Sequence, residues 1–409
     1  MYSNTIKPSI VEPTSFNTRN ARFNIDDNAY LSDILLGDFG MISPRLDPAL
    51  SHNYGALSGV LSCGARITLR SGETVIDSCE DTSVFAPTQV LQCTNAHSQD
   101  INRKELLAGL GFSVNEDGAY TLTPSTVDWH GKNVANDRHL NQFNIPTADT
   151  GASGLVHLSD YLPHLKSNAE LLFYPNLRLE IEWDTDPTNY HADGAGVITP
   201  TPIRPFLLLQ EIVGAKDPGE QKIPYLRNVI ERVVVEPVAL DVTQQLDLRT
   251  GAFVNKVVKD LTFVNQPSTQ GAFELWPRRQ RSVAQRNEIL QVVVNSEPIL
   301  PDRGITSGAQ KASMFNDTMS PLNMPYPAAC VDSIYDQYGN MLEDDVEDIV
   351  GNYSITCVPV NNLVNTLTIR FSRTGGVGVH QRETLYMYII GRVMSTMYID
   401  KLKNVTIRD

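Results

Sequence analysis

The fold class is decided by one short stretch, Leu177-Arg178-Leu179-Glu180-Ile181-Glu182-Trp183. Apolar and charged side chains alternate in it at every position. Successive side chains of a β-strand point to opposite faces of the sheet, so this alternation predicts a strand with one buried face. The same period appears in Cys63–Arg70, after which Ser71-Gly72 supplies a turn and Thr74–Ile76 begins a return strand.

Strand candidates continue through both halves of the chain. Pro205–Val213 is a more continuous apolar run, for which we expect burial on both faces. The candidates in the second half are Val229–Val235, Val238–Val242, Phe253–Val264, Leu290–Asn295, Tyr353–Val358, Leu367–Phe371, Leu385–Ile390, Met394–Ile399 and Val405–Arg408. Short helices are expected only at Ser98–Leu110 and Ser159–Lys166. A parallel α/β sheet needs long helices between its strands, so the sequence predicts an all-β fold.

The 409 residues divide into four expected segments. Residues 1–27 are polar without a sustained period, which predicts an N-terminal arm that becomes ordered only against a neighbour. Residues 216–224 are polar and rich in turn-forming residues, which predicts a linker. Residues 28–215 and 225–409 each suit an eight-stranded jelly roll, in which two sheets pack face to face. We therefore expect two tandem jelly-roll sandwiches, a double jelly roll, with a few short helices in loops.

The charge of the chain is acidic, with a formal net charge of −14 and a pI near 5.0. Proteins that grip phosphate backbones cluster Lys and Arg, so we expect no direct sequence-specific nucleic-acid binding. The one basic cluster consists of Arg278, Arg279, Arg281 and Arg286, beside Trp276. Contact with nucleic acid or with an acidic neighbouring subunit is one interpretation. A solvated loop anchored by the tryptophan is the favoured one.

The cysteines are few, odd in number and far apart: Cys63, Cys79, Cys93, Cys330 and Cys357. No CxxC pair occurs, so a zinc or thioredoxin-type site has no support, and folding in a reducing compartment is expected. The first residues lack the basic and apolar segments of a secretory signal. The sequence contains no run of about 18 apolar residues, so we expect no membrane-spanning helix. We expect a protein that is made inside the cell and not secreted.

Two groups of side chains are candidate metal sites. His157 and His164 would share a helix face, but Ser159 is a candidate cap that would place His157 before the helix. An acidic cluster could bind a hard cation such as Ca²⁺, although it lacks the spacing of an EF-hand loop and a solvated surface is favoured. Its members are Glu343, Asp344, Asp345, Glu347 and Asp348. We expect no metal site and no cofactor.

Catalytic motifs are missing from the sequence. It contains no GxxxxGK[ST], no GxSxG and no HExxH. Gly375-Gly376-Val377-Gly378 is glycine-rich, but no helical pattern follows it, which favours a hairpin tip over a phosphate-binding loop. Asp184 and Asp186 follow a strand, and turn formation explains them. We therefore predict no catalytic residue and no enzymatic activity.

Two stretches of the first half carry a resemblance to a known family. The first is Tyr54–Cys63, which runs into Ala65–Gly72, and the second is Gly154–Pro163, followed by Asn176–Trp183. With two tandem sandwiches, the chain resembles a double jelly-roll major capsid protein of the polinton-like virus, virophage and adintovirus group. The resemblance implies a structural protein of an icosahedral DNA-virus shell, located in the virion.

The same resemblance implies a mode of assembly. Three subunits with two jelly rolls each would form a homotrimeric, pseudo-hexagonal capsomer. Its implied partners are neighbouring capsomers, a vertex (penton) protein and cement or minor capsid proteins, while contact with a membrane is left open. The family has no catalytic signature, so no functional residue is transferred to this chain.

Two other functions remain open from the residues alone. A glycan- or receptor-binding β-sandwich protein would gather aromatic side chains at one loop end, and Trp129, Trp183 and Trp276 lie too far apart in sequence to decide this. A carbohydrate-active enzyme on two jelly rolls would need two carboxylates about 5 to 10 Å apart in one cleft. Such pairs form only in the folded chain.

Overall fold

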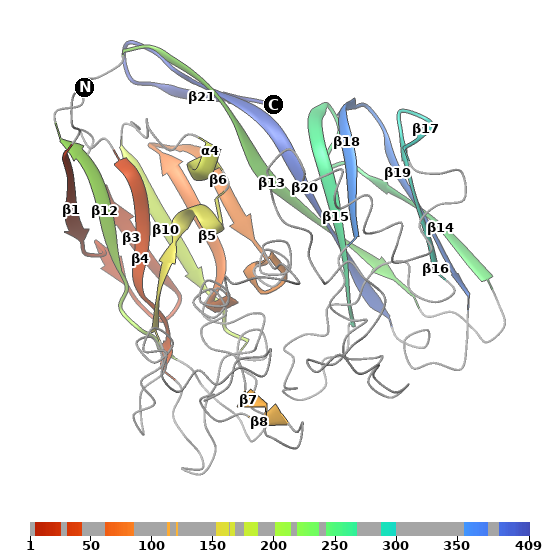
Figure 1. Cartoon of the computed structure of the whole chain (residues 1–409), viewed down its shortest axis with the longest axis horizontal. Coiled ribbons are helices and arrows are strands. Elements are labelled where there is room, and N and C mark those ends of the chain that lie inside the picture. The colour runs from red at the N-terminus through yellow and green to blue at the C-terminus, as the bar shows by residue number, and fades with distance from the viewer. Residues whose placement is uncertain are drawn as a thin grey trace.

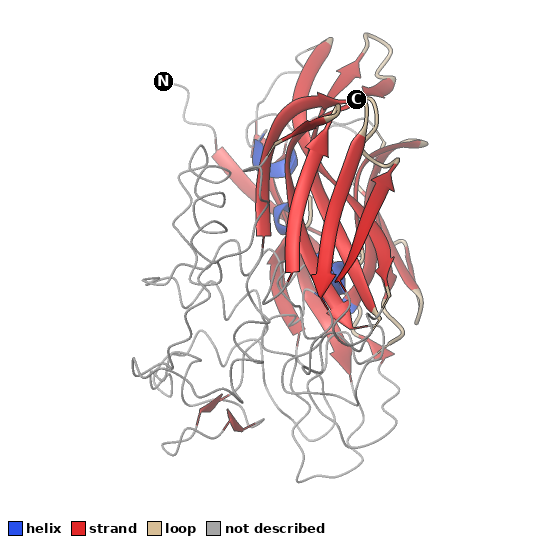
Figure 2. Ribbon diagram, turned by 90° about the vertical axis from the view of Figure 1, so that its right-hand side faces the viewer, coloured by secondary structure: helices blue, strands red, loops and turns tan. Residues whose placement is uncertain are grey.

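A computed structural model of the chain describes fourteen ranges of residues. They are 5–25, 31–42, 62–85, 113–114, 120–121, 153–162, 164–167, 176–186, 201–213, 219–236, 243–267, 288–299, 356–374 and 384–409. Strands make up almost all of the regular structure in them, with a few short helical turns (Figure 2). The fold is therefore all-β, as the sequence predicts.

The first half of the chain forms two five-stranded sheets. One contains, in order, β1 (Thr5–Val11), β12 (Phe206–Val213), β4 (Leu31–Ile42) and β11 (Thr201–Pro202), with β9 (Ser153–His157) also paired to β4. The other contains β2 (Ser15–Phe16), β3 (Asn20–Asn24), β10 (Leu177–Trp183), β5 (Gly64–Ser71) and β6 (Thr74–Glu80). Figure 1 shows these strands side by side. A separate small sheet pairs β7 (Ser113–Val114) with β8 (Tyr120–Thr121).

The second half forms the other two sheets. One contains β13 (Gln221–Val235), β20 (Leu385–Ile399), β15 (Lys256–Pro267) and β18 (Thr356–Val364), with β21 (Val405–Arg408) paired to β20. The other contains β14 (Thr243–Thr250), β19 (Leu367–Thr374), β16 (Glu288–Val294) and β17 (Glu297–Pro298). In Figure 1, β13 and β20 extend from this half towards the first, where β21 lies beside them. In each half, the two large sheets together contain more than the eight strands expected.

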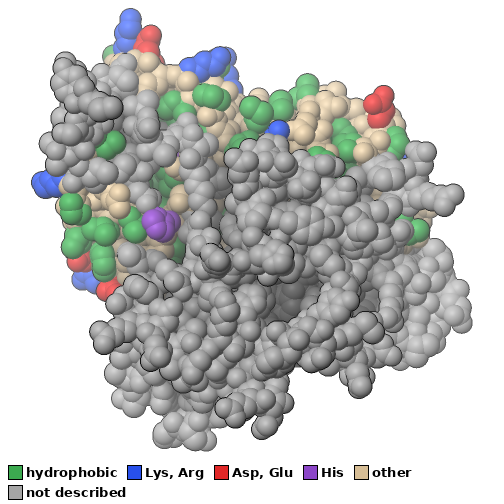
Figure 3. Space-filling view, viewed as in Figure 1, with side chains coloured by type: hydrophobic (Ala, Val, Ile, Leu, Met, Phe, Trp, Pro, Cys, Tyr) green, Lys and Arg blue, Asp and Glu red, His purple; other side chains and the backbone are tan. Residues whose placement is uncertain are grey.

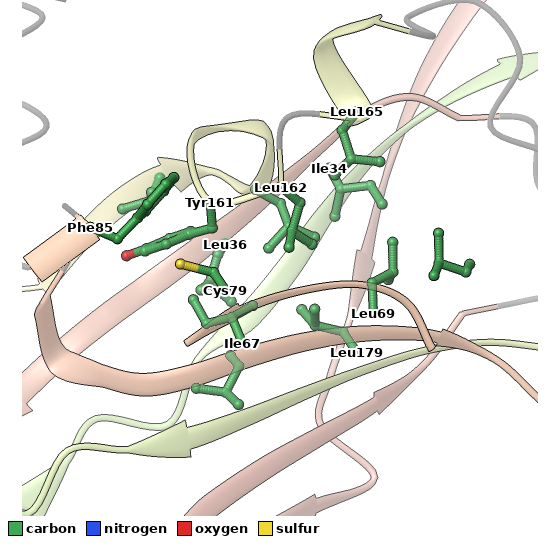
Figure 4. Packing of buried hydrophobic residues seen from close by; sticks show 14 of the residues in the cluster. Ile34, Leu36, Ile67, Leu69, Cys79, Phe85, Tyr161, Leu162, Leu165 and Leu179 are labelled. Atoms are coloured by element: carbon green, nitrogen blue, oxygen red, sulfur yellow. The ribbon is translucent and has the colours of Figure 1, made fainter. Parts of the chain in front are cut away.

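The hydrophobic cores explain why these segments form strands. In β10 the buried and exposed positions alternate, and Leu177, Leu179, Ile181 and Trp183 all point inward. Figure 4 shows Leu179 beside Leu69 of β5, its cross-strand partner, in the first core. The second core lies between the two sheets of the second half. Burial of each such side chain stabilises the fold by about 1.5–3 kcal/mol. The alternation of apolar and polar residues is therefore the strongest determinant of these strands.

The expectation that residues 1–27 form an N-terminal arm is wrong for residues 5–25, the part of this segment that the structure describes. β1 pairs with β12 over seven residues, and β3 pairs with β10. Ala21 and Phe23 of β3 are fully buried in the first core. β12 and β10, with which β1 and β3 pair, lie more than 150 residues away in sequence, and only the two-residue β2 pairs with β3 locally. A short and mostly polar segment therefore gives little local signal of its place in a sheet.

The expected linker at residues 216–224 is also too long. β13 begins at Gln221, so residues 221–224 belong to a strand. Pro224 cannot donate a hydrogen bond to a neighbouring strand, but β13 lies at the edge of its sheet, where proline is tolerated. The residues that disfavour regular structure in this segment therefore belong in part to the edge strand β13.

Three further expectations need correction. Leu385–Ile390 and Met394–Ile399 form one continuous strand, β20. The expected helix at Ser159–Lys166 is a 3₁₀ turn, η2 (Leu158–Asp160), followed by α4 (His164–Ser167). Pro205–Val213 is buried on one face only, because Leu207 and Leu209 point into the core while Phe206 and Leu208 are half-buried.

Ser98–Leu110, Val238–Val242 and the glycine-rich run at 375–378 lie outside the described residues.

Candidate functional site

The two halves meet along a seam made by the edge strands of two sheets. We use this name for Thr74, Ile76 and Asp77 of β6, His164 of α4, Tyr225 of β13 and Val405 of β21. The Tyr225 hydroxyl donates to the backbone carbonyl of Ile76 at 2.8 Å, and the Thr74 hydroxyl donates to the carbonyl of Val405 at 3.1 Å. Unpaired strand edges favour aggregation, so each half protects an edge of the other.

A buried acid–histidine pair lies in the seam. Asp77 Oδ2 lies 3.0 Å from His164 Nδ1, and the two side chains are 1% and 0% exposed. Burial raises the pKa of Asp77, and the hydrogen bond with His164 opposes this rise without cancelling it. The ring of Tyr225 packs edge-on against His164 at 5.4 Å, so the pair is enclosed by both halves. Burial also raises the pKa of the Tyr225 hydroxyl, which stays protonated as a donor.

A second polar network ties β21 to the same joint. Arg227 Nε donates to the Ser395 hydroxyl at 3.0 Å, and that hydroxyl donates to Asp409 Oδ1 at 2.7 Å. The Arg227 guanidinium also pairs directly with the Asp409 carboxylate. Charge-assisted hydrogen bonds of this kind are stronger than neutral ones. They hold the last strand against β13 and β20, beside the seam.

The opposite face of the same sheet contains another buried charge. Arg392 of β20 donates from Nε to both carboxylate oxygens of Asp260 on β15, at 2.8 Å each. Burial raises the pKa of Asp260, and the charge of Arg392 opposes it. A buried charge must be paired to be tolerated, so this contact fixes how β15 and β20 align.

The outward face of the sheet that contains β10 is charged. Arg66 pairs with Glu182, Arg70 with Glu180 at 3.1 Å, and Arg22 with Glu180 at 3.6 Å. Exposed ion pairs contribute little stability, about 0–1 kcal/mol each. This face is therefore a polar surface of balanced charge.

The histidines considered as metal ligands have different surroundings. His157 is exposed at the end of β9, whereas His164 is buried against Asp77 in the seam. Within the described ranges, no group of three or more His, Cys, Asp or Glu side chains is placed to hold a metal ion. The acidic cluster at 343–348 and the arginines Arg278–Arg286 lie outside those ranges.

Other predicted features take structural roles. Asp184 accepts a hydrogen bond from the backbone N–H of Asp186 at 2.9 Å, which is a turn contact as expected. Trp183 is buried and stacks on Phe39 with ring centroids 5.3 Å apart. Cys63, Cys79 and Cys357 are buried. Burial raises the pKa of the Cys79 thiol, which keeps it protonated and unreactive. No described helix is long and apolar enough to cross a membrane.

The sequence does not predict the contacts of the seam: His164 stands out only as a possible metal ligand, and Asp77 and Tyr225 do not stand out at all. Asp77 lies in a strand whose alternation is broken by a register shift between Leu69 and Arg70 on its partner β5. Its partner His164 is 87 residues away, and Tyr225 is 149 residues from Ile76. Contacts between residues so far apart leave no pattern in the local sequence around either residue.

Comparison with known proteins identifies the fold. No protein-family model and no curated protein matches the chain. Among solved structures, a chain of the Sputnik virophage matches with a TM-score of 0.62 at 11% identity, covering 100% of this chain and 89% of the other. The mavirus major capsid protein matches with a TM-score of 0.57 at 12% identity, covering 100% and 90%. VP54 of the virus PBCV-1 matches with a TM-score of 0.57 at 10% identity, covering 100% and 98%.

These matches run over the full length of the chain. The fold is therefore the double jelly roll of viral major capsid proteins, and the resemblance seen in the sequence is confirmed at the level of the fold.

Proposed function

We propose that this protein is a structural capsid protein, without catalytic activity, that forms the shell of an icosahedral DNA virus. The observation that carries the proposal is the full-length likeness to the mavirus major capsid protein and to a chain of the Sputnik virophage. A match to one jelly roll would indicate only a common sandwich. A match to both, in tandem, includes their connection and their packing.

The seam supports a mechanical role. Hydrogen bonds, the enclosed Asp77–His164 pair and a hydrophobic cluster with members from both halves join the two jelly rolls. A subunit whose modules keep one relative orientation can repeat in a lattice, because each contact then forms at a fixed place. We place the boundary between the modules at residues 214–220, just before β13.

In this proposal three copies form a pseudo-hexagonal homotrimer, which packs against neighbouring capsomers, a vertex protein and cement or minor capsid proteins in the virion. Obligate interfaces of this kind bury roughly 2,000 Å² or more. The acidic net charge leaves condensation of the genome to another, basic protein.

The test is the native mass of the purified full chain. Each chain has a mass of 45.3 kDa, so a trimer has a mass of about 136 kDa. We expect a trimer that persists on dilution, and hexagonally packed tiles by electron microscopy at high protein concentration. A stable monomer that forms no arrays would contradict the proposal.

A further inference from the structure

The turn that joins β20 to β21 holds a leucine out in water. Leu402 is 82% exposed, more than any other large hydrophobic side chain that the structure describes. Lys401 and Lys403 flank it in the sequence. A single exposed apolar side chain is common on protein surfaces and by itself indicates no partner. The surroundings of Leu402 therefore decide whether it has a role.

The turn is ordered by its own hydrogen bonds. The Asp400 carboxylate accepts from the backbone N–H groups of Leu402 and Asn404, at 2.8 Å each, and from the Asn404 side-chain amide at 2.9 Å. The backbone N–H of Lys403 donates to the Asp400 carbonyl at 3.0 Å, and Lys403 has a φ of 64°. A turn that is already ordered loses little backbone entropy when its apex makes a contact.

Further cations lie on the strands that lead to this turn. Lys222 of β13 and Arg408 of β21 lie over the ring of half-buried Tyr398 on β20, at 5.6 Å and 5.1 Å from its centroid. Lys222 is the cross-strand neighbour of Tyr398, and both cations are exposed. None of the ion pairs among the residues that the structure describes involves Lys222, Lys401 or Arg408.

These residues give an acidic chain one basic end. We call this end the basic tip, and it consists of Lys222, Tyr398, Lys401, Leu402, Lys403 and Arg408. The described carboxylates beside it are Asp400, which is bonded within the turn, and Glu220, so four cations exceed two anions by two charges. The whole chain has a net charge of −14. Figure 1 places the turn at the upper left end of β20 and β21, and Figure 3 shows Lys and Arg side chains at the surface there.

An anionic membrane surface is the partner that this tip fits. Segments that bind the bilayer interface combine an apolar side chain, which enters the acyl boundary, with cations that contact anionic headgroups. A tyrosine behind them lies at the headgroup level. The acidic remainder of the chain is repelled by such a surface, so charge favours the orientation that presents the tip. Nucleic acid would attract the cations, but its phosphates offer no apolar medium for Leu402.

We propose that the basic tip binds anionic lipid membranes, with Leu402 inserted at the acyl boundary and Lys222, Lys401 and Arg408 against the headgroups. This contact goes beyond the capsid function and does not depend on the trimer. One tip carries a single apolar side chain and few cations, so its contact is weak. Several tips presented together by an assembly strengthen one another, because each further contact is made at a high effective concentration.

The test is flotation of the full chain with lipid vesicles. We expect binding to vesicles of phosphatidylcholine and phosphatidylserine in a ratio of about 7:3, weaker binding at high salt, and none to phosphatidylcholine alone. Leu402→Ser removes the apolar side chain, and Lys401→Gln combined with Arg408→Gln removes two cations. Each variant should lower the bound fraction about fivefold or more.

Two control variants match these changes away from the tip. Arg370→Glu on β19 lowers the net charge by the same two units as the double variant, and Arg370 is exposed. Leu363→Ser removes a 47% exposed apolar side chain from β18. Both controls should bind as the parent chain does. Circular dichroism checks that every variant keeps its strands.

Three results would overturn the inference. The first is a parent chain that does not bind anionic vesicles or binds neutral ones equally, and the second is a loss in the tip variants no larger than in the controls. The third is full binding by Leu402→Ser together with binding of a short DNA duplex that the double variant loses, which would assign the tip to nucleic acid. The capsid function is tested separately by the native mass, which none of these results changes.

Discussion

Asp77 and His164 are titratable side chains that the fold isolates from water, at 1% and 0% exposure. Their contact at 3.0 Å is enclosed by β6, α4 and β13. Removal of one partner of such a pair leaves an uncompensated polar or charged group and costs about 3–5 kcal/mol. We therefore expect Asp77→Ala to lower the free energy of unfolding by about that amount, measured by denaturant titration.

Glu80 is the matched control for this substitution. It is also a β6 carboxylate, but it is exposed and lies 3.9 Å from Arg66. Glu80→Ala should change the unfolding free energy by no more than about 0.5 kcal/mol. Equal losses in the two variants would contradict the importance of the seam pair.

The raised pKa of Asp77 predicts a pH dependence with a definite sign. A carboxyl whose pKa is higher in the folded state than its ordinary value of 3.8 binds its proton more tightly when folded. Its stabilising contribution is complete below pH 3.8 and is lost as the pH rises through the folded-state pKa. The unfolding free energy of the parent, minus that of Asp77→Asn, should therefore decrease with rising pH over this range. An increase would show that His164 holds the carboxylate charged.

At the scale of elements, β20 depends on one glycine. Gly391 lies in the middle of this strand, and a Cβ there would meet the Phe253 ring at 2.3 Å. We expect Gly391→Ala to lower the unfolding free energy by about 1–3 kcal/mol, because the ring must move within a packed core. Thermal unfolding measures the loss. Gly251→Ala, where no atom lies within 4 Å, is the control.

Rescue distinguishes this steric cause from a change in strand propensity. Phe253→Leu combined with Gly391→Ala should recover part of the loss, since the smaller side chain makes room for the added methyl group. Additive losses in the double variant would contradict the steric explanation.

The strands that the sequence predicts well are those in which apolar and polar side chains alternate, because this alternation shows which face is buried. β10 matches its expected bounds because all four of its apolar side chains point into one core. β4 went unpredicted because Gly37, Asp38 and Gly40 interrupt its apolar run, and a register shift lies between Leu36 and Phe39. β1 went unpredicted because its place depends on β12, some 200 residues away. Local patterns therefore predict strands with a buried face, and long-range pairing decides the others.

The candidate site follows the same logic at the scale of the whole molecule. The seam and the buried Asp260–Arg392 pair both join residues that are far apart in sequence. The four large sheets could be anticipated as two sandwiches. The way in which the edges β6 and β13 meet could not, because it depends on side chains such as Tyr225 that look like ordinary strand residues in sequence.

Cooperativity of unfolding tests whether the two jelly rolls behave as one body. The hydrophobic cluster of the first jelly roll includes Tyr225, Met397 and Val405 from the second half, so the first core is incomplete without them. We expect a single calorimetric transition in the parent chain. Tyr225→Ala removes a buried ring and the hydrogen bond to Ile76, a loss of about 3–5 kcal/mol that falls on the seam.

In Tyr225→Ala the transition should therefore split, with the first jelly roll unfolding at the lower temperature because its cluster has lost a member that the second half supplied. Tyr225→Phe keeps the ring and removes only the hydroxyl, so it should retain one transition at a slightly lower temperature. Two transitions in the parent chain itself would mean that the halves fold independently. The rigid orientation on which a repeating lattice contact depends would then have to come from the neighbouring subunits and not from the seam.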